Sequence, residues 1–297
     1  MDSKCVVAKG ELLCERSGMT QQGRVTVTSQ RGDWYQYPSW YDILHSPGTA
    51  REVDGLARIA QRFGGVSSVA RRDPELWAGR WIEPGCGSGR YLRVAAGRGV
   101  RVTGFDASEP MIAYAKRSFQ RRGLSGDFFV ADMTDFRVRT KADFAFCMYS
   151  TIRHLMNDRA VLDHLACMAR ALARGGVYAV GMDVVGSMPQ QVSEDVWHGR
   201  RGRCSVTQAV QYLPGRTGTR REHVVSHLHI RTPRRSHHLD STYDLRTYST
   251  EQWAKLVGQS ALRMVSVCDE AGEKLERQDS RFGGYRVFVL GLPQARR

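Results

Sequence analysis

The chain of 297 residues lacks several features that would place it in a simple class. It has no C-x-x-C pair, which argues against a structural zinc site, and its seven cysteines show no close pairing typical of a disulfide framework. No apolar run approaches the length of a membrane span, and the first residues hold no apolar segment long enough for a signal peptide. We therefore expect no metal site, reduced thiols, no transmembrane segment and a cytoplasmic location.

Acidic residues are comparatively few. The chain holds 30 Asp and Glu against 44 Lys and Arg, which gives a formal net charge of +14. Such an excess favours a polyanion, an acidic metabolite or a membrane surface as partner, and charge alone does not choose among them. The length suits one large α/β domain, or one domain with a sizeable insertion.

Three glycines, by contrast, stand close together at one point of the chain. Residues 81–90 read WIEPGCGSGR, with glycines at alternate positions between an apolar, strand-like entry and a segment of helical character. Alternating glycines permit a turn that other residues rarely adopt, and the N–H groups at the start of the following helix can face a ligand. A turn of this kind also occurs in many α/β proteins that bind nothing there, so it needs supporting signals.

Carboxylates at strand ends supply part of that support. Asp106 ends a second apolar strand, at nearly the spacing from the glycine turn at which an acid meets a ribose hydroxyl pair, and Asp132 follows a third apolar run. A fourth run, residues 142–149, and a fifth ending at Asp183 alternate with helical segments. This alternation favours a parallel sheet with helices on both faces. The alternative for Asp106 and Asp132 is that each caps a following helix.

In their order, these motifs resemble those of a known family. The runs EPGCGSG, GFDASEPMIAYAKR, VADMTDF, ADFAFCMYSTIRHL and LARGGVYAVGMD, within roughly residues 78–185, resemble the motif series of class I S-adenosylmethionine-dependent methyltransferases. The small-molecule type that N-methylates amino sugars and small amines is most similar. The resemblance implies S-adenosylmethionine as cofactor. It also implies a doubly wound α/β fold with a mostly parallel seven-stranded sheet and an inserted antiparallel β region that covers the substrate.

The first motif carries the contacts to the methionine part of the cofactor. The resemblance places Glu83 towards its amino group, and the turn of Gly85, Gly87 and Gly89 beside it. Pro84 departs from the family pattern, which has an aliphatic residue at this position. Because proline removes an N–H donor, this departure bears on cofactor affinity.

The later motifs complete the expected cofactor site. Asp106 matches the acid that binds the ribose hydroxyls, and Asp132 matches the acid that accepts from the exocyclic amine of adenine. Ala107, Met111 and Met133 are expected to flank the adenine ring.

Three residues at or just after strand ends are candidates for catalysis. Tyr149, with Ser150 beside it, matches the segment that faces the methyl group, and ordinary strand-end packing is the alternative. A base is needed only if the acceptor arrives protonated, and Tyr149, His154 and Asp183 are the candidates. His154 is best matched to neutral pH, with packing at a helix start as its alternative role.

The N-terminal region lies outside the motif series. Residues 1–33 show neither helical nor strand periodicity, so we expect no regular structure there. Residues 34–45 hold five aromatic side chains, among them Tyr37, Trp40 and Tyr41. We expect them to form a hydrophobic clasp for the N-terminus, a lid over cofactor and substrate, or both.

The remaining patterns divide the chain into three ranges. Residues 34–185 are expected to form the cofactor-binding domain, residues 186–246 an inserted antiparallel β region, and residues 247–297 the return to the core sheet through a final hairpin. Gly175-Gly176 is expected to close the helix before the fifth strand, and Thr250 to cap the last helix.

The basic excess is concentrated in the inserted region. Between His198 and Ser236 there are nine arginines against one acid, Glu222. Guanidinium groups suit phosphate and carboxylate, so Arg200 and Arg203 are candidates for holding an anionic acceptor such as a nucleotide-linked amino sugar. A solvated outer face of the sheet is the alternative.

The expected reaction is transfer of the sulfonium methyl group to a nitrogen or oxygen of a small molecule, with an anionic acceptor favoured and no membrane partner. One alternative is an RNA methyltransferase, suggested by the net charge of +14. The sequence shows no RNA-binding module and no interleaving of aromatic and basic residues typical of single-strand binders. The other alternative is a non-catalytic binding scaffold, against which the retained acids Glu83, Asp106 and Asp132 argue.

Overall fold

The computed structural model describes residues 4–8, 11–20, 23–64, 79–188, 190–216, 218–276 and 282–293. The chain divides into two compact units. Residues 48–190 and 245–297 form the unit that we name the core unit, and residues 1–47 and 191–244 form the unit that we name the β unit.

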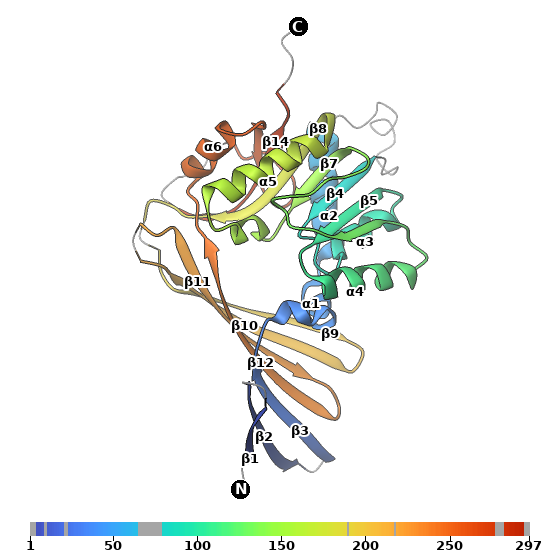
Figure 1. Cartoon of the computed structure of the whole chain (residues 1–297), viewed down its shortest axis with the longest axis vertical. Coiled ribbons are helices and arrows are strands. Elements are labelled where there is room, and N and C mark those ends of the chain that lie inside the picture. Colours follow the sequence, from blue (N-terminus) through green and yellow to red (C-terminus); the bar gives the residue numbers. More distant parts are fainter. Residues whose placement is uncertain are drawn as a thin grey trace. The chain divides into compact units, whose positions relative to one another are not determined.

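The core unit contains the expected seven-stranded, mostly parallel sheet (Figure 1). Its strands lie in the order β13 (Arg263–Cys268), β14 (Gly284–Gly291), β8 (Leu172–Val184), β7 (Ala142–Cys147), β4 (Arg80–Pro84), β5 (Arg101–Asp106) and β6 (Asp127–Val130). The five strands from β8 to β6 pair in parallel. β14 runs antiparallel to both β8 and β13, so the predicted closing hairpin is confirmed.

Helices cover both faces of this sheet, as the alternation predicts. The first face carries α2 (Thr49–Phe63), α3 (Arg90–Gly97) and α4 (Glu109–Gln120), and the second carries α5 (Asp158–Ala171) and α6 (Thr250–Gly258). Apolar side chains recur at helical spacing, so that Val53, Leu56 and Ile59 of α2 are all buried. Burying a side chain of this size contributes about 1.5–3 kcal/mol.

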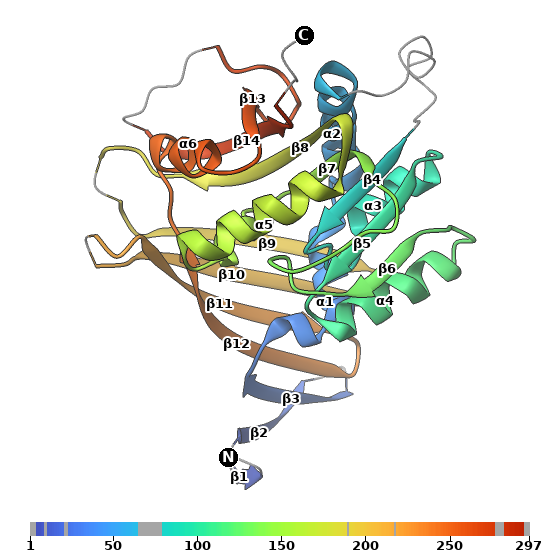
Figure 2. The same ribbon diagram turned by 45° about the horizontal axis from the view of Figure 1, so that its top comes forward.

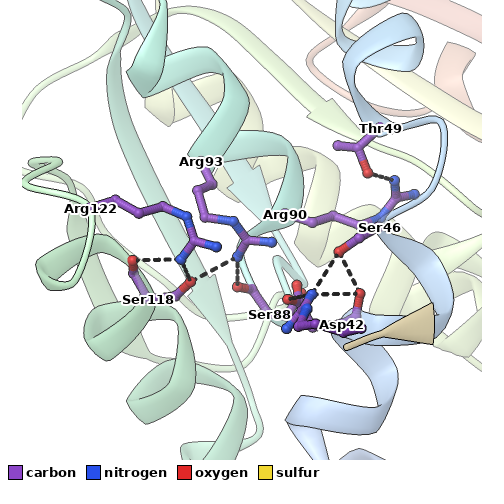
Figure 3. A network of polar contacts seen from close by, with 9 residues as sticks. Asp42, Ser46, Thr49, Ser88, Arg90, Arg93, Ser118 and Arg122 are labelled. Atoms are coloured by element: carbon purple, nitrogen blue, oxygen red, sulfur yellow. Dashed lines mark hydrogen bonds and ion pairs between the residues drawn. The ribbon is translucent and has the colours of Figure 1, made fainter. Parts of the chain in front are cut away.

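Polar contacts fix α3 to its neighbours (Figure 3). Arg93 Nη1 donates to the Ser88 carbonyl at 3.1 Å and to the Ser118 hydroxyl of α4 at 3.2 Å. Arg122 Nη1 donates to the same hydroxyl at 2.9 Å. The start of α3, where the glycine turn ends, is therefore held against α4.

Two local expectations in the core unit are wrong. α5 ends at Ala171, and Gly175, at φ +79°, lies inside β8 where the pairing with β7 shifts register, so the glycine serves a bulge and not a helix cap. At α6 the N-cap is Ser249, whose hydroxyl accepts from the Gln252 N–H at 3.2 Å, while Gln252 Oε1 accepts from the Ser249 N–H. This capping box satisfies two backbone donors, which Thr250, one residue later, does not do.

The β unit is a second seven-stranded sheet (Figure 2). Its strands lie in the order β1 (Lys4–Ala8), β2 (Glu11–Thr20), β3 (Gly23–Arg31), β12 (Arg235–Arg246), β11 (Arg221–Arg231), β10 (Cys204–Pro214) and β9 (Ser193–Arg201). β9, β10 and β11 pair antiparallel, in agreement with the predicted inserted β region.

The N-terminal region differs from its expectation of no regular structure. Residues 4–8, 11–20 and 23–31 are strands, and β3 pairs in parallel with β12 from Thr26 opposite Arg235 to Arg31 opposite Asp240. Residues 25–28 alternate valine and threonine, whose branched side chains suit an extended backbone. The partner strand is more than 200 residues away, so local composition does not reveal the pairing.

The aromatic segment belongs to the β unit, not to the cofactor domain in which the expected range 34–185 placed it. It forms η1 (Trp34–Gln36) and α1 (Pro38–His45), which pack on the apolar face of the sheet. Trp34 is buried there, and the rings of Tyr37 and Trp40 stack at 4.3 Å. The segment thus packs on the sheet of the β unit, and its role as a clasp or a lid stays a prediction.

Candidate active site

The glycine turn has the backbone that the sequence predicts. Gly85, Gly87 and Gly89 have φ angles of +64°, +51° and +69°, a region that favours glycine. A Cβ on Gly85 would lie 2.6 Å from Thr151 Cγ2, so no larger residue fits. After Pro84, the Cys86 N–H donates to the Phe105 carbonyl at 3.0 Å, and pairing with β5 continues despite the missing proline donor.

Glu83 lies at the end of β4 with 5% of its surface exposed. Burial raises the pKa of its carboxyl well above the usual value, and the Arg90 guanidinium opposes this rise. Among the described residues, its Oε2 atom has no hydrogen-bond partner. A buried acceptor without a donor costs about 1–3 kcal/mol, so this oxygen fits an incoming cationic N–H donor such as the amino group of the cofactor's methionine part.

Asp106 links the glycine turn to the loop after β5. Its Oδ2 accepts from the Gly87 N–H at 2.8 Å, and its Oδ1 accepts from the Ser108 N–H at 2.8 Å. Burial raises the pKa of Asp106, and these two hydrogen bonds oppose the rise. The N-cap of α4 is Ser108, so the helix-cap alternative for Asp106 is wrong. Each carboxylate oxygen keeps a second lone pair, which fits the ribose hydroxyls.

Asp132 is exposed in the loop after β6. The Thr134 N–H and Thr134 hydroxyl both donate to its Oδ1 at 2.7 Å, which lowers the pKa of Asp132 and keeps it ionised. No helix begins there, so the capping alternative is wrong here as well. The other carboxylate oxygen, Oδ2, suits the exocyclic amine of adenine.

The three residues expected to flank the adenine differ in accessibility. Ala107 is exposed and Met133 half-buried, which suits both for contact with a ring. Met111 is fully buried, so its side chain cannot reach a ligand in this structure. It faces the core because α4 turns that position towards the sheet, and its contact with the adenine stays a prediction.

Tyr149 and Ser150 form a strained turn after β7. Their φ angles are +54° and +60°, which costs non-glycine residues about 1–2 kcal/mol each. The turn is held from the sheet, because the Tyr149 N–H donates to the Tyr285 hydroxyl at 2.9 Å and the Ser150 N–H to the Gly181 carbonyl at 2.9 Å. The Ser150 hydroxyl donates to Asp183 Oδ2 at 3.0 Å. Asp183 thus joins Tyr149 in one group, as a support of the turn.

Two residues that the sequence reasoning missed complete this group. The Tyr149 hydroxyl donates to Glu52 Oε1 at 3.0 Å, and Glu52 Oε2 accepts from Arg90 Nη1 at 2.5 Å. Arg90 is buried, and its guanidinium lies 4.9 Å from the centre of the Tyr149 ring. Arg90 Nη1 also donates to the Thr49 hydroxyl of α2 at 2.8 Å (Figure 3). Because Arg90 directly follows the glycine turn, its position could have indicated a role in the site. Glu52 is one of several polar residues on α2, and nothing in the sequence distinguishes it.

Burial and Glu52 raise the pKa of Tyr149 to about 12. The phenol therefore keeps its proton at neutral pH and donates it to Glu52. His154 is exposed at the end of η2 (Thr151–His154), four residues after Ser150. The contacts that position Tyr149 come from Glu52, Arg90 and Tyr285, so His154 remains a prediction from the sequence alone.

The expected acceptor-binding residues lie in the β unit. Tyr37, Trp40 and Tyr41 are half-buried in the aromatic segment. Arg200 and Arg203 are exposed at the hairpin between β9 and β10, where Arg200 Nε donates to the Gly202 carbonyl at 3.0 Å. Their contact with an acceptor stays a prediction.

The chain was compared with known proteins. Residues 82–176 match the family model described as a methyltransferase domain. Among solved structures, the chain is similar to DesVI of Streptomyces venezuelae at 19% identity, covering 88% of this chain and 99% of that chain with a TM-score of 0.66. It is also similar to the sugar N-methyltransferase KedS8 of a Streptoalloteichus species (19%, 85% and 92%, TM-score 0.61) and to the amino pentose methyltransferase CalS10 of Micromonospora echinaspora (19%, 80% and 90%, TM-score 0.57).

At this identity the structural likeness shows the fold. The fold is that of solved S-adenosylmethionine-dependent methyltransferases, and residues 82–176 match a methyltransferase domain. No curated protein matches the chain. Within the part of the chain that the structure describes, no helix is both long and apolar enough to cross a membrane.

Proposed function

We propose that the enzyme transfers the methyl group of S-adenosylmethionine to a nitrogen or oxygen of a small molecule, with the amino group of a sugar as the favoured acceptor. The observation that carries this proposal is the Tyr149 hydroxyl, whose proton is committed to Glu52 at 3.0 Å. Its oxygen lone pairs can then accept an N–H from an amine. The sugar preference is supported by the likeness to KedS8 and CalS10, which are a sugar N-methyltransferase and an amino pentose methyltransferase.

Binding of the cofactor would use three acids at the ends of neighbouring strands. Glu83 would accept from the amino group, Asp106 from the ribose hydroxyls, and Asp132 from the adenine amine. When bound, the cofactor supplies an activated methyl group on a sulfonium centre. The protein then contributes mainly alignment, which accelerates such a displacement without covalent help.

Orientation of the acceptor would fall to Tyr149. A hydroxyl that donates to Glu52 can accept from the amine N–H and so direct the nitrogen lone pair. Because the pKa of Tyr149 is raised to about 12, the phenol acts by hydrogen bonding and does not act as the base. An amine that arrives as ammonium must lose a proton first, and we keep His154 and Asp183 as candidates for accepting it.

Further acceptor contacts are proposed for residues of the β unit. We propose that its aromatic segment acts as a lid as well as a clasp, and that Arg200 and Arg203 hold an anionic group of the acceptor, such as a phosphate. Both arginines are exposed on a hairpin, which suits paired hydrogen bonds to phosphate. The cysteine content leads us to propose a cytoplasmic enzyme.

The test is methyl transfer from radiolabelled S-adenosylmethionine to a panel of acceptors: amino sugars free and nucleotide-linked, the matching hydroxyl sugars, and transfer RNA. We expect the amino sugars to be labelled. Labelling of RNA alone would establish the nucleic-acid alternative, and cofactor binding without labelling of any acceptor would support a scaffold.

The role of Tyr149 has its own measurement in the same assay. We expect Tyr149→Phe and Glu52→Gln to lower turnover, and the double variant to lose little more, because coupled residues are not additive. Glu109→Gln, an exposed acid in the first turn of α4, is the matched control and should keep the wild-type rate. Full turnover in Tyr149→Phe would contradict the role.

A further inference from the structure

A buried histidine connects α5 to the loop that holds Asp132. His164 is fully buried, with Nδ1 lying 2.8 Å from the Met133 carbonyl and Nε2 lying 2.7 Å from the Tyr178 hydroxyl. Met133 directly follows Asp132. The imidazole therefore connects Tyr178 of β8 to the loop that is expected to bind the adenine.

The proton positions in this link are fixed by chemistry. A carbonyl oxygen only accepts, so Nδ1 carries the hydrogen and donates to Met133. Burial lowers the pKa of His164 to about 4, so the ring is neutral and Nε2 accepts from the Tyr178 hydroxyl. The donors then point in one direction, from the Tyr178 hydroxyl of β8 through His164 to the Met133 carbonyl.

α5 makes a second contact with the same loop. Cys167, three residues after His164 and so on the same helix face, donates through its thiol to the Thr134 carbonyl at 3.3 Å. On the other side of the loop, the Thr134 N–H and hydroxyl bond to Asp132 Oδ1. The backbone carbonyls of Met133 and Thr134 thus both accept hydrogen bonds from side chains of α5. Thr134 in turn donates to the Asp132 carboxylate.

Simple core packing does not require this arrangement. An apolar residue could fill the site, whereas a buried polar chain costs stability unless each member has its partner. One of the two hydrogen bonds of the imidazole goes to the backbone of the loop and not to another part of the core. A role in fixing the position of the loop therefore explains why a histidine stands here.

We propose that His164 is a positioning residue for the adenine of the cofactor: through the Met133 carbonyl it fixes the loop in which Asp132 meets the exocyclic amine. The inference rests on the proposed adenine contact of Asp132 and is independent of the acceptor. His164 should therefore affect the preference for adenine over other bases more than the overall affinity for the cofactor.

The experiment compares two probes by calorimetry, S-adenosylhomocysteine and S-inosylhomocysteine, which carries an oxygen where adenine has its amine. We expect the wild type to prefer the adenine compound by about tenfold or more, equivalent to about 1.4 kcal/mol. The ratio of the two dissociation constants is the readout, because a general loss of stability would weaken both compounds equally.

Two variants divide the hydrogen bonds of the imidazole. An asparagine amide lies near the position of Nδ1 and a glutamine amide near that of Nε2. His164→Asn should therefore keep the Met133 bond and the preference for adenine, whereas His164→Gln should keep the Tyr178 bond and lose most of the preference. Tyr178→Phe, which removes the far partner only, is the matched control and should keep the ratio.

A preference retained in His164→Gln, a preference lost equally in both His164 variants, or a wild type that binds the two probes equally would each overturn the proposal. If the variants do not fold, a measurement on the wild type still tests the proposal. In ¹⁵N-histidine spectra, the Nδ1–H tautomer of His164 should shift on addition of S-adenosylhomocysteine, and an unchanged signal would equally overturn it. None of these results depends on methyl transfer, so the proposed acceptor can fail separately.

Discussion

At the scale of single residues, Glu83 should couple cofactor binding to protons. Burial raises the pKa of this carboxyl, and its Oε2 atom lacks a partner among the described residues. An ammonium placed beside it favours the charged form and lowers that pKa again. Binding of S-adenosylhomocysteine at a pH between the ordinary and the raised pKa of this carboxyl should therefore release protons, measured as the dependence of the binding enthalpy on the ionisation enthalpy of the buffer.

The matched pair for this prediction is Glu83→Gln and Glu109→Gln. The first should bind more weakly and release no protons, and the second, exposed on α4, should behave as the wild type. Proton release that persists in Glu83→Gln would contradict the assignment of Glu83.

At the scale of elements, the hairpin between β9 and β10 carries one arginine with a structural partner, Arg201, and two for which acceptor binding is proposed, Arg200 and Arg203. Arg201 Nη2 lies 2.7 Å from Oδ2 of Asp42, whose side chain is fully buried in α1. Arg200 and Arg203 are exposed beside it. Arg201→Gln should lower the free energy of unfolding by about 2 kcal/mol, because a buried acceptor loses a charged partner.

The double variant Arg200→Gln with Arg203→Gln should leave stability unchanged and raise the KM for an anionic acceptor. Urea unfolding and steady-state kinetics measure the two effects. An unchanged KM would contradict acceptor binding and indicate that both arginines only form part of a solvated face of the sheet.

Sequence patterns predicted whole elements better than their connections. The apolar spacing of α2 and the strand-end acids Asp106 and Asp132 report local geometry directly. Two errors concern partners: the bulge at Gly175 depends on pairing with β7, and β3 depends on a strand more than 200 residues away. The third, the cap of α6 at Ser249 and not at Thr250, is a shift of one residue at a helix boundary. Local composition carries no information on such pairings, because the hydrogen bonds that decide them come from distant segments.

The same distinction holds for the site. The glycine turn and the acids Glu83, Asp106 and Asp132 were predicted because parallel strands present their carboxyl ends at one edge of the sheet. Glu52, Tyr285 and His164 come from a helix before the motif series, the last strand and a buried helix face. Each acts through a contact that exists only after folding, and nothing in its sequence neighbourhood marks it.

At the scale of the whole molecule, His164 should make stability depend on pH. Its folded pKa is about 4, below the ordinary 6.5, so between these values the unfolded chain binds a proton that the folded protein does not. The free energy of unfolding should therefore fall as the pH falls from 6.5 to 4, by about 3 kcal/mol from this group. Asp132, whose pKa is lowered, should add a further loss at more acidic pH.

Urea unfolding between pH 7 and pH 4 measures this dependence. His164→Asn should have a shallower dependence than the wild type, whatever its stability at pH 7, because the titrating group is gone. Equal slopes for the two proteins would contradict the assignment of a neutral, buried imidazole.

The most direct test of the central claim is calorimetric titration of the wild type and of Asp106→Ala with S-adenosylhomocysteine. Asp127→Ala, an exposed acid at the start of β6, is the control, and thermal unfolding verifies the fold of each variant. Loss of the carboxylate should weaken binding by about 1.5–3 kcal/mol, while the control binds as the wild type. Equal affinity in Asp106→Ala and the wild type would contradict a cofactor site built on the glycine turn and the acid that ends β5.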